Sequence, residues 1–166
     1  MKPSERLISL DVFRGITIMG MILVNNPGTW SAVYPQLLHA EWHGCTFTDL
    51  IFPFFLFIVG VAISYSLTKR KAQGGSMKSL YLNIIRRTVI LFLLGIILNG
   101  FPFGLLFGHQ FSWETLRIPG VLQRIAIVYC VSAFLFLTTS TKFQYWFTAA
   151  ILILYAAVMS FIPVPG

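Results

Sequence analysis

One short stretch of the chain, residues 38–49, carries side chains that can transfer protons. It contains His39 and His43, two of the three histidines, and it has no Lys or Arg. Imidazole exchanges protons near neutral pH, so either ring could serve as a general base. If the stretch were helical, their spacing of four would place both rings on one face.

Two other interpretations of these histidines stay open. They can be polar loop residues without a special role, which is the simplest interpretation of the residue types alone. They can also bind a metal with Glu41 or Cys45, but the spacing matches no closed zinc pattern and leaves a fourth ligand unassigned, so we expect no metal. Asp49 opens the next apolar run, where its carboxylate is predicted to cap the free N–H groups of a helix.

A second group of polar residues interrupts apolar segments. Asp11 and Arg14 are three residues apart and can meet on one helix face, and Arg124 is a charge within another apolar run. Ionisable groups at membrane depth usually face a bundle interior or a watery cavity. The pattern favours either a cavity for a charged or sugar-like ligand or a structural polar network. Asn25 is a candidate helix cap or sugar hydrogen-bonding group.

Composition indicates the setting of these residues. The 166 residues are 57% hydrophobic and only 10% charged, whereas soluble domains have about 25% charged residues. We therefore predict an all-α, polytopic transmembrane helical bundle. The net charge of +7 does not indicate a nucleic-acid partner, because most basic residues flank apolar runs, where membrane orientation explains them.

Five segments are long and apolar enough to cross a bilayer, since a spanning helix needs about 20 residues. The predicted helices cover residues 7–26, 49–67, 88–107, 120–138 and 145–164.

The basic residues predict the orientation. Nine of the twelve Lys and Arg lie on one side of these segments, which the positive-inside rule assigns to the cytoplasm together with the N-terminus; they are Lys2, Arg6, Lys69, Arg70, Lys71, Lys78, Arg86, Arg87 and Lys142. Residues 27–48 then face outward. The loop at residues 69–87 could bind phosphate groups, but orientation and anionic lipid headgroups already account for its charge.

A series of motifs runs from Ser9 to Arg124. In chain order they read SLDVFRG from Ser9, VNN from Val24, HAEWHGCT from His39, DLIFPF from Asp49, FIVG from Phe57 and RIPGVLQR from Arg117. This series resembles the heparan-α-glucosaminide N-acetyltransferase family, in particular its bacterial relatives. The resemblance implies that residues 1–166 are the N-terminal part of a single integral-membrane acyltransferase domain with more spanning helices.

The resemblance also implies an activity. Members of the family use cytosolic acetyl-CoA to acetylate the amine of a glucosamine on the opposite side of the membrane. The active histidine of the His-Ala-x-Trp motif corresponds to His39, and the implicated asparagine of the Val-Asn motif corresponds to Asn25. We expect the acetyl acceptor to contact residues among Asp11, Arg14, His43, Asp49 and Arg124.

At His43 the sequence departs from the lysosomal member of the family that it resembles, which has asparagine there, so contacts with the acceptor are expected to differ. We expect a bacterial inner-membrane protein whose partners are an amino-sugar acceptor and the lipid bilayer; a homodimer is left open. The alternative is a sugar permease or export subunit, in which Asp11, Arg14 and Arg124 line the substrate path.

Overall fold

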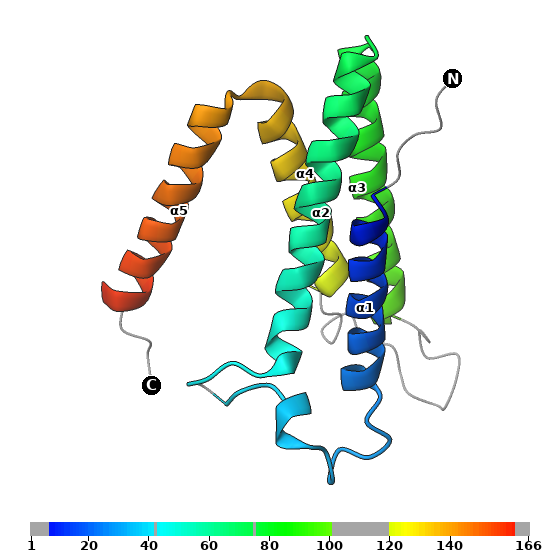
Figure 1. Ribbon diagram of the computed structural model, residues 1–166, viewed down its shortest axis with the longest axis vertical. Coiled ribbons are helices and arrows are strands. Elements are labelled where there is room, and N and C mark those ends of the chain that lie inside the picture. The colour runs from blue at the N-terminus through cyan, green and yellow to red at the C-terminus, as the bar shows by residue number, and fades with distance from the viewer. Residues whose placement is uncertain (1–6, 42, 75, 101–119, 162–166) are drawn as a thin grey trace. The chain divides into compact units, whose positions relative to one another are not determined.

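The computed structural model describes residues 7–41, 43–74, 76–100 and 120–161 (Figure 1). These residues form helices and connecting segments, with no strand among them. All five α-helices are long and apolar enough to span a membrane, which confirms the predicted all-α transmembrane class. The elements are α1 (Ile8–Asn25), the short 3₁₀ helix η1 (Pro35–Leu37), α2 (Phe47–Ala72), α3 (Met77–Gly100), α4 (Val121–Thr138) and α5 (Thr141–Phe161).

The predicted helix boundaries agree best for α1 and α4, the two helices of 18 residues. The predicted helices at residues 7–26 and 120–138 match α1 and α4 to within one residue at each end. The prediction of residues 49–67 was too short for α2, and residues 145–164 began four residues late for α5. The predicted ends at Phe107 and Val164 lie outside the described residues.

The predicted basic loop at residues 69–87 was wrong. Lys69, Arg70 and Lys71 form the last turn of α2. The third helix begins at Met77 rather than near Thr88, so its first turns include Lys78, Arg86 and Arg87. An apolar window marks only the part of a helix that lies in hydrocarbon, whereas Lys and Arg are good helix formers that extend the helix beyond it.

The described residues up to Ala62 form one compact unit. Within it, the Phe13 ring of α1 packs edge-on against Phe54 and Phe57 of α2, with ring centroids 5.3 and 6.3 Å apart. Gly20 lies against the Phe47 ring, and a Cβ there would come within 3.2 Å of a ring carbon. The absent side chain thus lets the first turn of α2 approach α1 closely.

The described residues from Ile63 onward form the second compact unit. Tyr81 of α3 stacks on Phe134 of α4, with ring centroids 5.3 Å apart. Ala126 and Ala133 of α4 are completely buried. Small residues at such an interface let two helices approach closely, which is the usual basis of helix packing within membranes.

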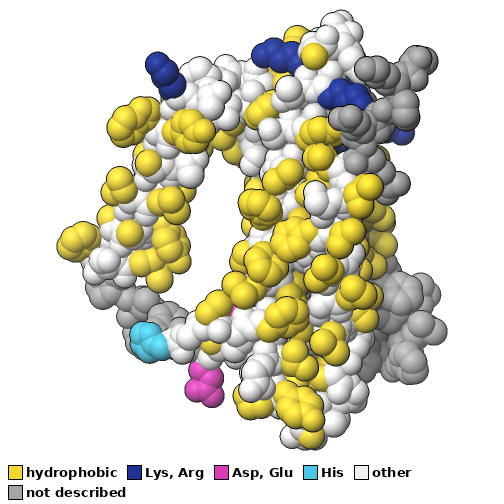
Figure 2. All heavy atoms as spheres, viewed as in Figure 1, with side chains coloured by type: hydrophobic (Ala, Val, Ile, Leu, Met, Phe, Trp, Pro, Cys, Tyr) yellow, Lys and Arg dark blue, Asp and Glu magenta, His cyan; other side chains and the backbone are white. Residues whose placement is uncertain are grey.

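The surface of the helices is apolar. Figure 2 shows hydrophobic side chains along the helices, with Lys and Arg at helix ends. No described residue of α5 is buried, and its exposed side chains include Ile153 and Leu154. An aqueous surface would not tolerate so much apolar area, whereas lipid tails accept it. This chain is a multi-pass membrane protein.

Candidate active site

The described residues between Leu37 and Phe47, which include His39 and His43, are not helical. The helix η1 ends at Leu37, and no helical residue is described between it and Phe47. Gly44 has φ +136°, a backbone conformation that favours glycine and breaks any regular helix there. The condition under which the two histidines would share one helix face is therefore not met.

The start of α2 is fixed by a short Thr-x-x-Asp sequence. Thr46 is the residue before the helix, and Asp49 is its third residue. Asp49 Oδ2 accepts a hydrogen bond from the Thr46 backbone N–H at 2.9 Å and another from the Ala40 N–H at 3.2 Å. This is one half of a capping box, in which an acidic side chain satisfies the free N–H that precedes the helix. Asp49 thus caps the start of α2, as predicted, but it accepts from N–H groups that precede the helix rather than from the free N–H groups within it.

The same carboxylate holds His39. Nδ1 of His39 lies 2.6 Å from Asp49 Oδ1. An ionised carboxylate can only accept, so Nδ1 carries the hydrogen and the neutral ring has its lone pair on Nε2. The imidazole is 76% exposed. A histidine held at one nitrogen with its basic nitrogen open to solvent is the arrangement of a general base or a nucleophile.

Thr46, which was not among the predicted site residues, completes this arrangement. Its Oγ1 lies 2.6 Å from the Leu38 carbonyl oxygen and 2.9 Å from Asp49 Oδ2. The single hydroxyl hydrogen serves one acceptor at a time, so the side chain connects the residue before His39 with the carboxylate. The Thr-x-x-Asp spacing before an apolar run was the available signal.

The structure places two other predicted residues apart from this hydrogen-bond network. Asn25 lies at the end of α1, where its Nδ2 donates to the Met21 carbonyl at 2.8 Å. His43 is exposed and makes no hydrogen bond or ion pair with any described residue. No described hydrogen bond joins either residue to His39, so their predicted roles stay predictions.

The charged residues within helices have different settings. Asp11 and Arg14 meet on α1, with Arg14 Nη1 3.2 Å from Asp11 Oδ1, as their spacing predicts. Arg124 is exposed on α4 and has no ion-pair partner among the described residues. For metals, the described part of the chain contains no group of three His, Cys, Asp or Glu side chains that could hold an ion.

Comparison with known proteins gives relatives over most of the chain. It is 36% identical over 143 residues to heparan-alpha-glucosaminide N-acetyltransferase of Mus musculus and 41% identical over 130 residues to that of Homo sapiens. These alignments cover 86% and 78% of this chain but 20% and 19% of the relatives. The predicted resemblance is confirmed, and the chain spans about a fifth of the length of the curated relatives it matches. A family match extends over residues 6–164, and by this match the chain belongs to the family described as Domain of unknown function (DUF5009).

Proposed function

We propose that this chain is part of an integral-membrane N-acetyltransferase that transfers the acetyl group of acetyl-CoA to the amine of an amino sugar. The relatives are named as N-acetyltransferases of a glucosaminide, which supports this reaction type. The observation that carries the proposal is the hydrogen bond of 2.6 Å between His39 Nδ1 and Asp49. It leaves Nε2 as the basic atom of an exposed ring.

The proposed membrane orientation follows from the basic residues. We assign the end of α2 at Lys69–Lys71 and the start of α3 to the cytoplasm, because Lys and Arg are retained there. Residues 27–48, which include His39, then face the outer side of a bacterial inner membrane. A periplasmic or cell-wall amino sugar is the acceptor that this orientation favours.

The transfer requires a base because only an unprotonated amine attacks a thioester. In direct transfer, His39 Nε2 takes the proton of the amine, and the amine nitrogen forms a bond to the acetyl carbon. The carbon–sulfur bond breaks, and CoA leaves as a thiolate that then takes up a proton. Asp49 stabilises the imidazolium formed on His39, because its carboxylate contacts Nδ1 at 2.6 Å.

A covalent route uses the same atoms in two steps. His39 Nε2 first attacks the acetyl carbon and releases the CoA thiolate. The amine then takes the acetyl group from the ring and passes its proton to the freed Nε2. Both routes need Nε2 unprotonated and exposed. The two routes are distinguished by incubating the protein with labelled acetyl-CoA without acceptor and then quenching. Only the covalent route leaves labelled acetyl on the protein.

The test is acetyl transfer from labelled acetyl-CoA to glucosamine, measured with the full-length protein in proteoliposomes. We expect wild type to transfer the label and His39→Ala to lose transfer, because removal of a general base or nucleophile costs at least about a hundredfold in rate. Glu41→Gln is the matched control, since this exposed loop residue makes no hydrogen bond or ion pair with a described residue. Equal transfer by wild type and His39→Ala would exclude His39 from the mechanism.

The permease alternative predicts different results for these variants. It requires sugar transport without acetyl-CoA and depends on Asp11, Arg14 and Arg124 rather than on His39. Uptake of labelled glucosamine into proteoliposomes that is insensitive to His39→Ala and abolished by Arg14→Gln would favour the permease. Nothing in the contacts of Arg124, which has no described ion-pair partner, favours it over the transferase.

A further inference from the structure

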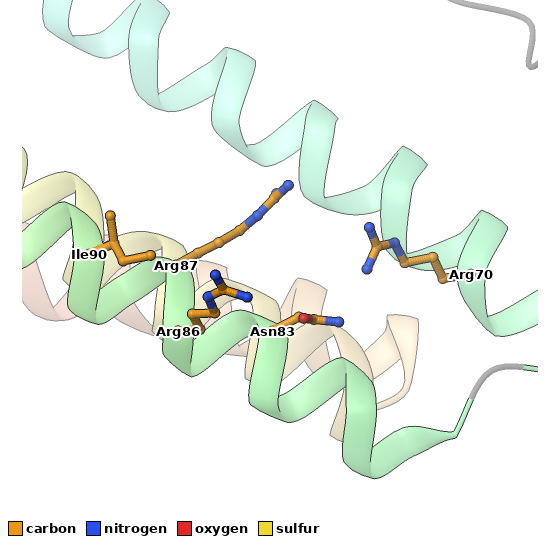
Figure 3. A pocket seen from close by; sticks show the side chains of 5 residues that line it. All are labelled: Arg70, Asn83, Arg86, Arg87 and Ile90. Carbon is orange, nitrogen blue, oxygen red and sulfur yellow. The ribbon is translucent and has the colours of Figure 1, made fainter.

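An open pocket lies where α2 ends and α3 begins, within the second compact unit. Its volume is about 330 Å³, and its polar lining consists of Arg70 from α2 and Asn83, Arg86 and Arg87 from α3. Figure 3 shows the Arg70 and Arg87 side chains extending from the two helices into the space between them. All four side chains are exposed, so a ligand can reach them.

The α3 wall of the pocket is a helical stripe. Asn83, Arg86, Arg87 and Ile90 follow the spacing i, i+3, i+4 and i+7, which places them on one face. On another face Ile84 is 1% exposed. Packing of α3 against α4 therefore holds the backbone of this stripe in place, and the charged side chains project from a rigid element.

The three guanidinium groups have no acidic partner in this part of the chain. The sequence has no Asp or Glu between Asp49 and Glu114, and none after Glu114. Among the described residues, no ion pair involves Arg70, Arg86 or Arg87. Like charges that line one pocket repel each other, and an anion bound between them removes this cost.

From this arrangement we infer that the pocket binds the phosphate groups of a phosphate ester. A planar guanidinium donates two parallel hydrogen bonds to a phosphate, and the Asn83 amide adds a neutral donor. A volume of about 330 Å³ is at the lower end of the range for small-molecule sites. Two sources supply this chemistry: the phosphates of CoA, which rests on the proposed function, and the headgroup of an anionic phospholipid.

The test measures binding rather than acetyl transfer, so that it can fail independently of the proposed function. The full-length protein is placed in nanodiscs of phosphatidylcholine alone and titrated with adenosine 3′,5′-bisphosphate, a soluble probe that carries the phosphates of the CoA nucleotide. In a second arm, thermal stability is compared between nanodiscs of phosphatidylcholine and nanodiscs that also contain phosphatidylglycerol.

The variants separate a built site from general positive charge. Arg86→Gln and Arg87→Gln each remove one guanidinium, and Arg87→Lys keeps the charge but loses the paired hydrogen bonds. Lys78→Gln is the matched control, because this exposed residue lies on the same helix, carries the same charge and does not line the pocket. Asn83→Asp places a carboxylate in the pocket without removing an arginine, which covers the case in which an arginine variant fails to fold.

If the soluble nucleotide is the ligand, each of Arg86→Gln, Arg87→Gln and Asn83→Asp weakens binding of the bisphosphate about tenfold or more, and Lys78→Gln leaves it unchanged. If the headgroup is the ligand, the same variants abolish the stabilisation by phosphatidylglycerol and bisphosphate binding is absent throughout. Equal effects of Lys78→Gln and the arginine variants, or no effect of any variant in either arm, would overturn the inference.

Discussion

Two polar groups of this chain have opposite surroundings. The Asp49 carboxylate accepts hydrogen bonds from the His39 ring, from the Ala40 and Thr46 backbone N–H groups and from the Thr46 hydroxyl. The Gln123 carboxamide is 1% exposed at the contact of α3 and α4. Neither its nitrogen nor its oxygen has a hydrogen-bond partner among the described residues.

This difference shows which polar group is positioned by residues nearby in the sequence and which is positioned by contact with another helix. Every donor to Asp49 lies within ten residues of it in sequence, so a short segment builds the site by itself. The carboxamide of Gln123 instead packs against Gly95 of another helix, where a Cβ would meet its Cδ and Oε1 at 2.7 Å. Burial of an unpartnered amide costs free energy of folding, whereas a satisfied carboxylate does not carry that cost.

The largest expected effect is that of Asp49→Asn. The amide cannot accept from all donors at once, so the His39 ring loses its fixed hydrogen position, and we expect kcat to fall at least about a hundredfold. The KM for acetyl-CoA should stay near its wild-type value. Steady-state kinetics on the folded fraction checks this. If Asp49 only capped α2, the variant would lose thermal stability and keep kcat per folded molecule.

An intermediate effect is expected for Gly95→Ala. The new methyl group would lie 2.7 Å from the Gln123 carboxamide and 3.0 Å from Leu122 Cβ. Overpacking costs about 1–3 kcal/mol, and the better helix propensity of alanine offsets about 1 kcal/mol of it. Thermal unfolding in detergent should therefore show a lower Tm. Gly60→Ala is the matched control, because a Cβ at Gly60 meets nothing within 4 Å.

The smallest expected effect is that of Gln123→Met, which keeps the shape of the side chain and removes both polar atoms. Since the amide has no described partner, its loss should raise the free energy of unfolding by about 1 kcal/mol. Unfolding in a denaturing detergent measures this change. A variant less stable than wild type would show that Gln123 has a polar partner and would remove the contrast with Asp49.

Much of the fold could be predicted from the sequence. Apolar runs of the required length identified all five α-helices of the described residues, because bilayer thickness sets that length directly. The polar turns at the start of α3 were missed because hydropathy does not detect helix outside hydrocarbon. The periodic spacing of Asn83, Arg86 and Arg87 was the signal that would have found them.

The site was predicted only in part. His39 was named from its motif and Asp49 from its position before an apolar run, but their contact was not predicted. It depends on local backbone geometry such as the positive φ of Gly44, and periodicity does not determine such geometry. Phosphate binding by residues 69–87 was considered and set aside, because membrane orientation and lipid headgroups account for their charge. The common face of Asn83, Arg86 and Arg87 was missed because these residues were interpreted as a loop.

Asp49 both caps the start of α2 and holds the His39 ring, so motion at this helix end affects the proposed catalytic base. Helix termini fray, and the Thr46 amide is protected from hydrogen exchange only while the carboxylate accepts from it. Each fraying event therefore also frees the imidazole of His39. The hydrogen-exchange rate of the Thr46 amide therefore reports how often His39 is released from Asp49. It can be measured without any substrate.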